Sequence, residues 1–580
     1  MPASASLQVS TNVAIPMRDG VRLYADVYRP DGPGPFPVLL QRTPYNKTLA
    51  RAMLDPLKAA EQGFAVVIQD TRGRYTSEGA FYAFRDEPLD GYDTVEWAAA
   101  QPWSSGKIGM FGSSYVGATQ WLAATTQPPH LSAIMPRITA SNYHEGWAYQ
   151  GGAFELGFNI SWTLLQLTLA NFQNLAARLD LASDRRQALL ETVDAMEPAF
   201  RVLPLKSLPH LRDGLADYFY DWLAHPSYDE YWQQWCIEDR HHQISTPAYH
   251  IGGWYDIFLG GTIRNYLGMR EHGATEATRR GQKLIIGPWQ HGAARGPGIA
   301  GEHYFGLGSD PLVIDLDGMH FRWFDYWLKG IDNGILDEPP VRLFVMGDNV
   351  WRDELAWPLE RAQSVNYFFH SQGKANSLRG NGALSPQAPA DEPPDAFLYN
   401  PADPVPTQGG PLCCNAYFLP NGAFDQRDIE AREDVLVYST PPLERDIEVT
   451  GPVTVTLWAA TSATDTDFTA KLVDVCADGC ARNLTEGIIR ARYRESTSAP
   501  SLVQPGEVYR YTIDLWATSN VFKQGHQIRV EVSSSNFPRF DRNTNTGNTI
   551  AEDAGFKPAL QTILHNAQYP SHITLPIVPR

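Results

Sequence analysis

The residues best suited to do chemistry begin with a serine between two glycines. Residues 112–117 read Gly-Ser-Ser-Tyr-Val-Gly, directly after a short apolar run at 107–111 and before a helical pattern. A strand–turn–helix of this kind lifts a serine hydroxyl above a parallel sheet, and the helix N-terminus favours developing negative charge. Ser114 has a glycine two residues before it, whereas the second glycine, Gly117, comes one position late. Ser113 fits neither glycine, so Ser114 is the predicted nucleophile, although an ordinary Gly-Ser turn would look similar.

A serine hydroxyl needs a base to take its proton and a carboxylate to hold that base. Asp256 follows the predicted strand 248–251, and His291 follows the predicted strand 283–286, each on a glycine-rich loop. The order serine, aspartate, histidine is the one that this strand–helix fold uses. We therefore predict a catalytic triad of Ser114, Asp256 and His291.

Asp70 is the main rival to the predicted acid. It also follows a predicted strand, at 64–69, but it precedes Ser114 in the chain. It opens the sequence Asp-Thr-Arg-Gly-Arg, which is typical of an ion-paired structural turn. The other histidines compete poorly. His241 and His242 precede a strand, whereas His144, His225 and His526 lie in the helical or strand-rich segments, where a histidine more often has a structural role.

The segments that would position these residues alternate between strand and helix. Short apolar runs separated by helical stretches predict a parallel sheet covered by helices, which is an α/β fold. These runs lie at 38–41, 64–69, 107–111, 248–251 and 283–286.

Two further segments differ in character. The first, at 143–240, is rich in Leu, Ala, Gln and aromatic residues at helical spacing, and this pattern predicts a helical cap. The second has short strand-like runs between Gly, Pro and Asn turns, and predicts a β-sandwich or jelly roll with a long Pro-rich loop at 385–406. The predicted division is 1–142 and 241–350 for the α/β-hydrolase domain, 143–240 for the cap, and 351–580 for the jelly roll.

Several short motifs resemble one known family of hydrolases. They are Arg-Thr-Pro-Tyr at 42–45, Gln-Asp-Thr-Arg-Gly-Arg at 69–74, the hexapeptide 112–117, Gly-Trp-Tyr-Asp at 253–256, Gly-Pro-Trp-Gln-His at 287–291, Pro-Val-Pro-Thr-Gln-Gly-Gly at 404–410, and Asn-Phe-Pro-Arg-Phe-Asp at 536–541. With these motifs the chain resembles the cocaine-esterase-like (CocE/NonD) hydrolases, which are related to X-prolyl dipeptidyl peptidases and α-amino acid ester hydrolases. The late second glycine, Gly117, is similar to the family's own pattern, Gly-x-Ser-Tyr-x-Gly.

The resemblance implies a serine esterase. Acyl transfer by a serine triad needs no cofactor, and we predict neither a cofactor nor a metal in the site. It implies the same triad, and an oxyanion hole made by the backbone N–H of Tyr115 and the hydroxyl of Tyr45. Without the resemblance, the sequence would predict only that Tyr45 is a core tyrosine after a proline turn.

Substrate choice is not carried by the resemblance. Relatives that hold a free α-amino group use an acidic cluster, and the sequence does not place such a cluster here. Glu145 and Glu155 in the cap could each reach the pocket or be solvated. Four aromatic residues of the cap predict an apolar acyl or aryl pocket, although a cap core would look alike. They are Trp147, Phe154, Phe158 and Trp162.

Composition excludes some partners. With 47 Lys and Arg against 65 Asp and Glu, the net charge is −18, which disfavours nucleic acid and anionic membranes. The start of the sequence shows no basic run leading into an apolar stretch, so we predict a cytoplasmic location. Cys413 and Cys414 are adjacent, and Cys476 lies near Cys480; reduced thiols, local pairing or, at the second pair, a metal remain open.

The predicted partner is a small-molecule ester, and a homo-oligomer is compatible with the sequence. An X-prolyl dipeptidyl peptidase or a β-lactam or α-amino acid ester acylase on the same triad remains an alternative. So does a non-catalytic protein that binds through its jelly roll.

Overall fold

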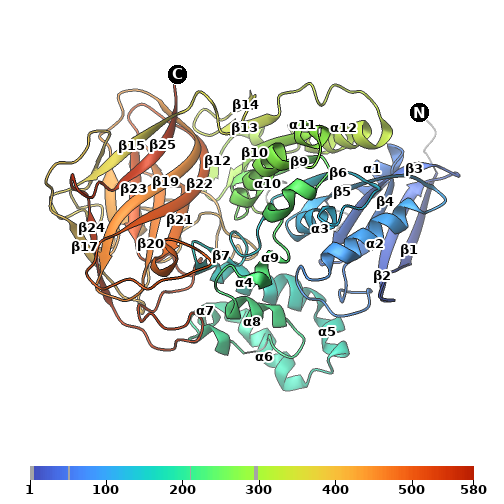
Figure 1. Ribbon diagram of the computed structural model, residues 1–580, viewed down its shortest axis with the longest axis horizontal. Helices are drawn as coiled ribbons and strands as arrows, with labels where there is room; N and C mark the ends of the chain where they lie inside the picture. The colour runs from blue at the N-terminus through green and yellow to red at the C-terminus, as the bar shows by residue number, and fades with distance from the viewer. Residues whose placement is uncertain (1–5, 50–52, 210, 293–297) are drawn as a thin grey trace.

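The protein is described by a computed structural model over residues 6–49, 53–209, 211–292 and 298–580 (Figure 1). In this part of the chain, one large sheet of ten strands is built from residues 7–354 and another of eleven strands from residues 363–578. A group of helices, from α4 to α9, lies beside both sheets (Figure 1). This is the α/β arrangement with a helical cap and a C-terminal β domain that the sequence predicts.

The N-terminal sheet is mostly parallel. Its strand order is β1-β2-β4-β3-β5-β6-β9-β10-β13-β14. Strands β4 to β13 of this order pair in parallel, whereas β1, β2 and β14 join antiparallel at the two edges. The strands are β1 Leu7–Pro16, β2 Arg22–Pro30, β3 Phe36–Thr43, β4 Ala65–Asp70, β5 Ser104–Ser113, β6 Leu131–Arg137, β9 Ala248–Tyr255, β10 Gln282–Gln290, β13 Val341–Val345 and β14 Val350–Glu354.

Helices cover both faces of this sheet, which is why its strands are continuous apolar runs. Leu39 of β3 packs in one core with α1 and α12, and Leu40 packs on the opposite face with α2 and α3. The helices are α1 Pro56–Glu61, α2 Glu87–Ala99, α3 Tyr115–Ala124, α10 Leu259–His272 and α12 Leu316–Lys329.

The cap follows β6 and returns to the sheet at β9. It begins with a short hairpin and continues as short helices, one of which, η2, is a π-helix that starts at Trp162. Its elements are β7 Tyr149–Gln150, β8 Ala153–Phe154, α4 Leu156–Ser161, η2 Trp162–Thr168, α5 Phe172–Arg178, α6 Ser183–Asp194, α7 Met196–Phe200, α8 Asp217–Ala224 and α9 Glu230–Gln233. In the described ranges, no helix is long and apolar enough to cross a membrane.

The C-terminal domain is a mostly antiparallel β structure. Its main strands are β15 Gln363–His370, β17 Asp395–Tyr399, β19 Ile447–Thr461, β20 Asp467–Val475, β21 Ala481–Arg490, β22 Tyr509–Phe522, β23 Gln527–Ser533, β24 Ala559–Leu564 and β25 His572–Val578. One apolar core joins this domain to Trp254 of β9 and Leu259 of α10, so the two sheets are packed together.

The prediction of one long loop at 385–406 was wrong, because β17 lies inside it and pairs with β24. Asp395, Phe397 and Tyr399 are buried at alternate positions of β17. The alternation of buried and exposed residues spans only five positions, and the prolines around the strand made this short pattern hard to recognise in the sequence.

Candidate active site

Ser114 stands at the sharp turn between β5 and α3. Its backbone has φ 62° and ψ −128°, a conformation that costs a non-glycine residue about 1–3 kcal/mol and is concentrated at functional sites. Ser113 is the last residue of β5 and pairs with Arg137 of β6. The strand therefore holds Ser113 in the sheet, and Ser114 is the serine raised at the turn.

The two glycines of the hexapeptide are required by close contacts with different neighbours. A Cβ on Gly112 would lie 2.3 Å from the Val116 side chain, so the turn itself requires this glycine. A Cβ on Gly117 would lie 2.8 Å from Cβ of Thr139, in the chain that follows β6. The late second glycine is thus explained by the close approach of α3 to the neighbouring segment.

The structure brings Ser114, His291 and Asp256 into one hydrogen-bonded chain. Nε2 of His291 lies 3.0 Å from Oγ of Ser114, and Nδ1 lies 2.6 Å from Oδ1 of Asp256. Asp256 is fully buried, and the His291 side chain is 8% exposed. The ring of Phe258 packs edge-on against the imidazole at 5.2 Å. A buried carboxylate in this position fixes the imidazole so that Nδ1 carries a proton and Nε2 faces the serine.

Asp70 has a different role. Its carboxylate accepts hydrogen bonds from the backbone N–H of Lys47 at 2.7 Å and from the Thr76 hydroxyl at 3.1 Å. Burial raises its pKa, and these contacts partly offset that rise. Asp70 therefore stabilises the turn that follows β4. The sequence predicted such a structural role for Asp70 from the motif Asp-Thr-Arg-Gly-Arg.

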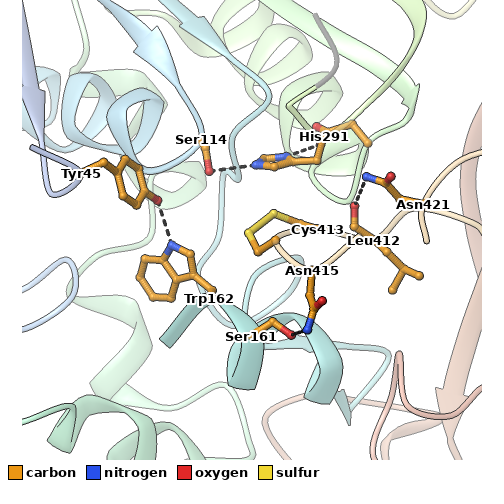
Figure 2. The surroundings of a disulfide bond; sticks show 11 residues. Tyr45, Ser114, Ser161, Trp162, His291, Leu412, Cys413, Asn415 and Asn421 are labelled. Carbon is orange, nitrogen blue, oxygen red and sulfur yellow. Dashed lines mark hydrogen bonds and ion pairs between the residues drawn. A yellow bond between two sulfur atoms is a disulfide. The ribbon is translucent and has the colours of Figure 1, made fainter. Parts of the chain in front are cut away.

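Tyr45 lies on the opposite side of Ser114 from His291 (Figure 2). It follows β3 and the proline at 44, and its backbone N–H donates to Oγ1 of Thr43 at 3.0 Å. The Tyr45 hydroxyl oxygen accepts the indole N–H of Trp162 at 2.8 Å. Burial raises the pKa of Tyr45 to about 12, although hydrogen bonding with Trp162 and Ser114 opposes the rise. The hydroxyl is therefore a neutral proton donor at physiological pH.

Tyr115 begins α3, so its backbone N–H has no acceptor within the helix. Its hydroxyl donates to Oε1 of Glu87 at 3.1 Å and accepts the backbone N–H of Phe84 at 2.9 Å. Glu87 also binds Arg42 of β3 at 2.7 Å, and all these side chains are buried. This network ties the start of α3 to the strand that leads to Tyr45.

Three of the four cap aromatics lie next to the triad. Trp147 stacks on Phe258 with ring centroids 4.5 Å apart, and Phe158 packs edge-on to Trp147 at 5.5 Å. Trp162 stacks on the Tyr115 ring at 5.8 Å. Phe154 instead packs on Tyr149 and Phe219 in the interior of the cap.

The two cap glutamates form contacts within and between domains. Glu155 is 1% exposed and receives Arg539 of the C-terminal domain at 3.4 Å. Glu145 accepts the backbone N–H of Gly151 at 3.1 Å. Burial raises the pKa of each carboxyl to about 7. Neither residue provides the acidic cluster that would hold a free amine.

The sequence did not predict that the C-terminal domain also contributes to the site. Cys413 and Cys414 are joined by a disulfide, which lies between the His291 and Trp162 side chains (Figure 2). Cys413 is buried in the same apolar core as the cap aromatics. The adjacent cysteines were the available signal, but nothing in their local sequence places them beside a serine some 300 positions earlier. Cys476 and Cys480 are free thiols.

Together these groups form a site suited to acyl transfer. The Ser114 hydroxyl has a hydrogen-bonded imidazole on one side and the Tyr45 phenol on the other, and Ser114 directly precedes the N-terminus of α3. Buried aromatic side chains adjoin them.

Comparisons with known proteins identify the family of the chain. Residues 19–293 match the family described as X-Pro dipeptidyl-peptidase (S15 family), and residues 333–574 match the X-Pro dipeptidyl-peptidase C-terminal non-catalytic domain. The cocaine esterase of Rhodococcus sp. (strain MB1 Bresler) is 41% identical over 580 aligned residues, which cover 99% of each chain. The chain belongs to the cocaine-esterase-like (CocE/NonD) family of serine hydrolases.

Solved structures support the same family and fold. An aminopeptidase from a marine sediment Thaumarchaeota archaeon is 26% identical, with a TM-score of 0.80 and coverage of 99% of this chain and 97% of that one. An α-amino acid ester hydrolase is also 26% identical, with a TM-score of 0.79 and coverage of 100% and 97%. The predicted family and fold class are confirmed, and this CocE/NonD protein is a hydrolase acting on ester bonds.

Proposed function

We propose that Ser114, His291 and Asp256 are the catalytic triad of an acyl-ester hydrolase. The Ser114 hydroxyl attacks the ester carbonyl carbon while Nε2 of His291 takes its proton. Asp256 stabilises the imidazolium that forms. The imidazolium then protonates the leaving alcohol, which departs and leaves an acyl group on Ser114. A water molecule attacks this acyl-enzyme by the same route and releases the acid.

The negative charge that develops on the carbonyl oxygen needs two donors. We assign them to the Tyr45 hydroxyl, on the side of Ser114 away from His291, and to the backbone N–H of Tyr115, the first residue of α3. Donors that are fixed before the reaction stabilise the transition state without reorganisation, and each is worth about 2.7–4 kcal/mol. The observation that carries the proposal is the continuous hydrogen-bonded chain from Asp256 through His291 to Ser114, at 2.6 and 3.0 Å.

We propose esters with small or aromatic acyl groups as substrates. The aromatic rings of Trp147, Phe158, Trp162 and Phe258 pack together beside His291 and Tyr115, and flat apolar groups pack well against such rings. The relative from Rhodococcus is a cocaine esterase. Glu145 binds the backbone N–H of Gly151 and Glu155 binds Arg539, so neither carboxylate is free to hold a substrate amine.

A substrate panel tests this function. We expect p-nitrophenyl acyl esters to be turned over with a higher kcat/KM than aminoacyl or X-prolyl anilides. A higher kcat/KM on the anilides, with weak turnover when the amine is blocked, would make the protein a peptidase or amino-acid ester acylase instead. A fluorophosphonate probe should label Ser114, and failure to label would favour a non-catalytic binding protein.

Two further predictions remain to be checked on the purified protein and in the cell. Light scattering would show whether it is a homo-oligomer, and fractionation would show whether it is cytoplasmic.

A further inference from the structure

The Cys413–Cys414 disulfide sits at the end of a loop from the C-terminal domain. The base of this loop is closed by Gly410 and Gly422, whose backbones exchange hydrogen bonds of 2.7 and 2.9 Å. The backbone carbonyl of Leu412 accepts the side-chain amide of Asn421 at 3.1 Å, next to His291 (Figure 2). The loop thus brings two sulfur atoms from the C-terminal domain to the triad.

The other end of the loop is attached to the cap. The side-chain amide of Asn415 donates to the Ser161 hydroxyl at 3.4 Å (Figure 2). Ser161 directly precedes Trp162, whose indole binds Tyr45. The segment that carries the disulfide is therefore linked to the residue that orients the Tyr45 hydroxyl.

The Cys413–Cys414 disulfide offers an apolar surface and a bond that can be reduced. Cys413 is 2% exposed within the aromatic core, and disulfide sulfur is polarizable and packs well against rings. Cys414 is only partly buried and has φ 74°, a left-handed conformation that costs a cysteine free energy. A bond between neighbouring residues closes a small ring that restricts both backbones. Cleaving the bond frees Cys414 to leave this conformation and lets the Cys413 sulfur move.

We propose that the Cys413–Cys414 disulfide is a redox-controlled specificity wall of the acyl pocket. In the oxidised form it limits the acyl group that packs against Trp162. Attack by a dithiol on the sulfur of Cys414 transfers two electrons and two protons to the pair, so two thiols form and the dithiol becomes a disulfide. The reduced loop then admits larger acyl groups. The inference rests on the proposed acyl-ester hydrolysis at Ser114.

The first test establishes the bond. Purified protein is blocked with iodoacetamide under denaturing conditions, with or without prior reduction, and analysed by mass spectrometry of the peptide containing 413 and 414. We expect two additional alkylations of this peptide only after reduction. Alkylation of both cysteines without reduction, in protein prepared in air, would overturn the proposal.

The second test measures selectivity. Wild-type enzyme is reduced with dithiothreitol, freed of reductant under argon, and assayed with p-nitrophenyl acetate and p-nitrophenyl benzoate. We expect reduction to shift the benzoate-to-acetate ratio of kcat/KM towards benzoate by roughly tenfold, the discrimination that a small change in an apolar pocket provides. An unchanged ratio in protein whose two thiols are shown to be free would refute the wall.

Matched variants identify the cysteines responsible. The Cys413→Ser/Cys414→Ser variant should show the shifted ratio without reductant and should not respond to it. Cys476→Ser/Cys480→Ser, which changes the two free thiols next to β20 and β21, should behave like wild type. A response that persists in the first variant would assign the effect to other residues. If the first variant does not fold, the wild-type ratio alone decides.

Failure of the proposed function gives a different result. If neither redox form turns over any ester, acyl-ester hydrolysis is wrong, and the wall is then tested by the rates at which small and bulky fluorophosphonates label Ser114. Reduction should speed labelling by the bulky probe relative to the small one. Equal effects on both probes would refute the wall.

Discussion

The indole N–H of Trp162 donates to the Tyr45 hydroxyl oxygen at 2.8 Å. The two residues come from different parts of the chain, Trp162 from the cap and Tyr45 from the loop after β3. Because the phenol oxygen already accepts this bond, its own proton is directed elsewhere, and Ser114 lies on that side (Figure 2). The cap therefore sets the direction in which Tyr45 donates.

Removing that contact should slow the reaction without abolishing it. In Trp162→Phe the Tyr45 hydroxyl loses one neutral hydrogen bond, worth about 1 kcal/mol, so we expect kcat to fall roughly fivefold. Steady-state kinetics on a p-nitrophenyl ester measures this. Trp147→Phe is the matched control, because the Trp147 indole N–H has no hydrogen-bond partner among the described residues. Equal losses in both variants would show that the indole acts only through packing.

The Tyr45 hydroxyl itself should matter far more. Tyr45→Phe keeps the ring and removes one oxyanion donor, so we expect kcat to fall by roughly a hundred- to a thousand-fold. KM should change little, because the charge develops only in the transition state. Tyr143→Phe, which removes a buried hydroxyl that has no partner in the described structure, is the control and should be near wild type. A near-normal kcat in Tyr45→Phe would leave the second donor unassigned.

The position of the nucleophile can be tested with adjacent serines. Ser114→Ala should lower kcat by about six orders of magnitude, since the members of a triad act as a unit. Ser113→Ala should retain most activity, because Ser113 is part of β5. Active-site titration and melting curves would separate loss of chemistry from loss of folding. An active Ser114→Ala beside an inactive Ser113→Ala would reverse the assignment.

The buried carboxyl of Glu155 should make stability depend on pH. Burial raises its pKa from 4.5 to about 7, so the folded protein binds a proton that the unfolded chain releases between these values. The contribution of the Glu155 carboxyl to the free energy of unfolding is fully present below pH 4.5 and is lost as the pH rises to 7. The loss amounts to at most about 3 kcal/mol for this one group.

Urea unfolding at pH 5 and pH 8 would measure this loss. We expect Glu155→Gln to show a smaller fall in unfolding free energy than wild type, since Gln can still accept from Arg539. Glu271→Gln is the control, because the Glu271 side chain is 76% exposed. The same fall in wild type and Glu155→Gln would mean that Glu155 does not titrate in this range.

The sequence by itself determined the fold class and the candidate triad. Each of these depends on short windows: an apolar run, a glycine-rich turn and one polar residue after the strand. The carboxyl ends of parallel strands meet at one edge of a sheet, so Ser114, Asp256 and His291 could be expected together from their order alone. Tyr45 came only from the family resemblance, because nothing in its neighbourhood distinguishes it from a core tyrosine.

Only the tertiary structure decided what surrounds these residues. Trp162 and Tyr45 are 117 positions apart, and their hydrogen bond depends on how the cap packs on the sheet. The Cys413–Cys414 loop reaches the site from another domain, and Glu155 binds Arg539 of that domain. The physical reason is that hydrophobic periodicity and turn chemistry act over a few neighbouring residues. Contacts between distant segments arise only when whole domains pack, and no local pattern records them.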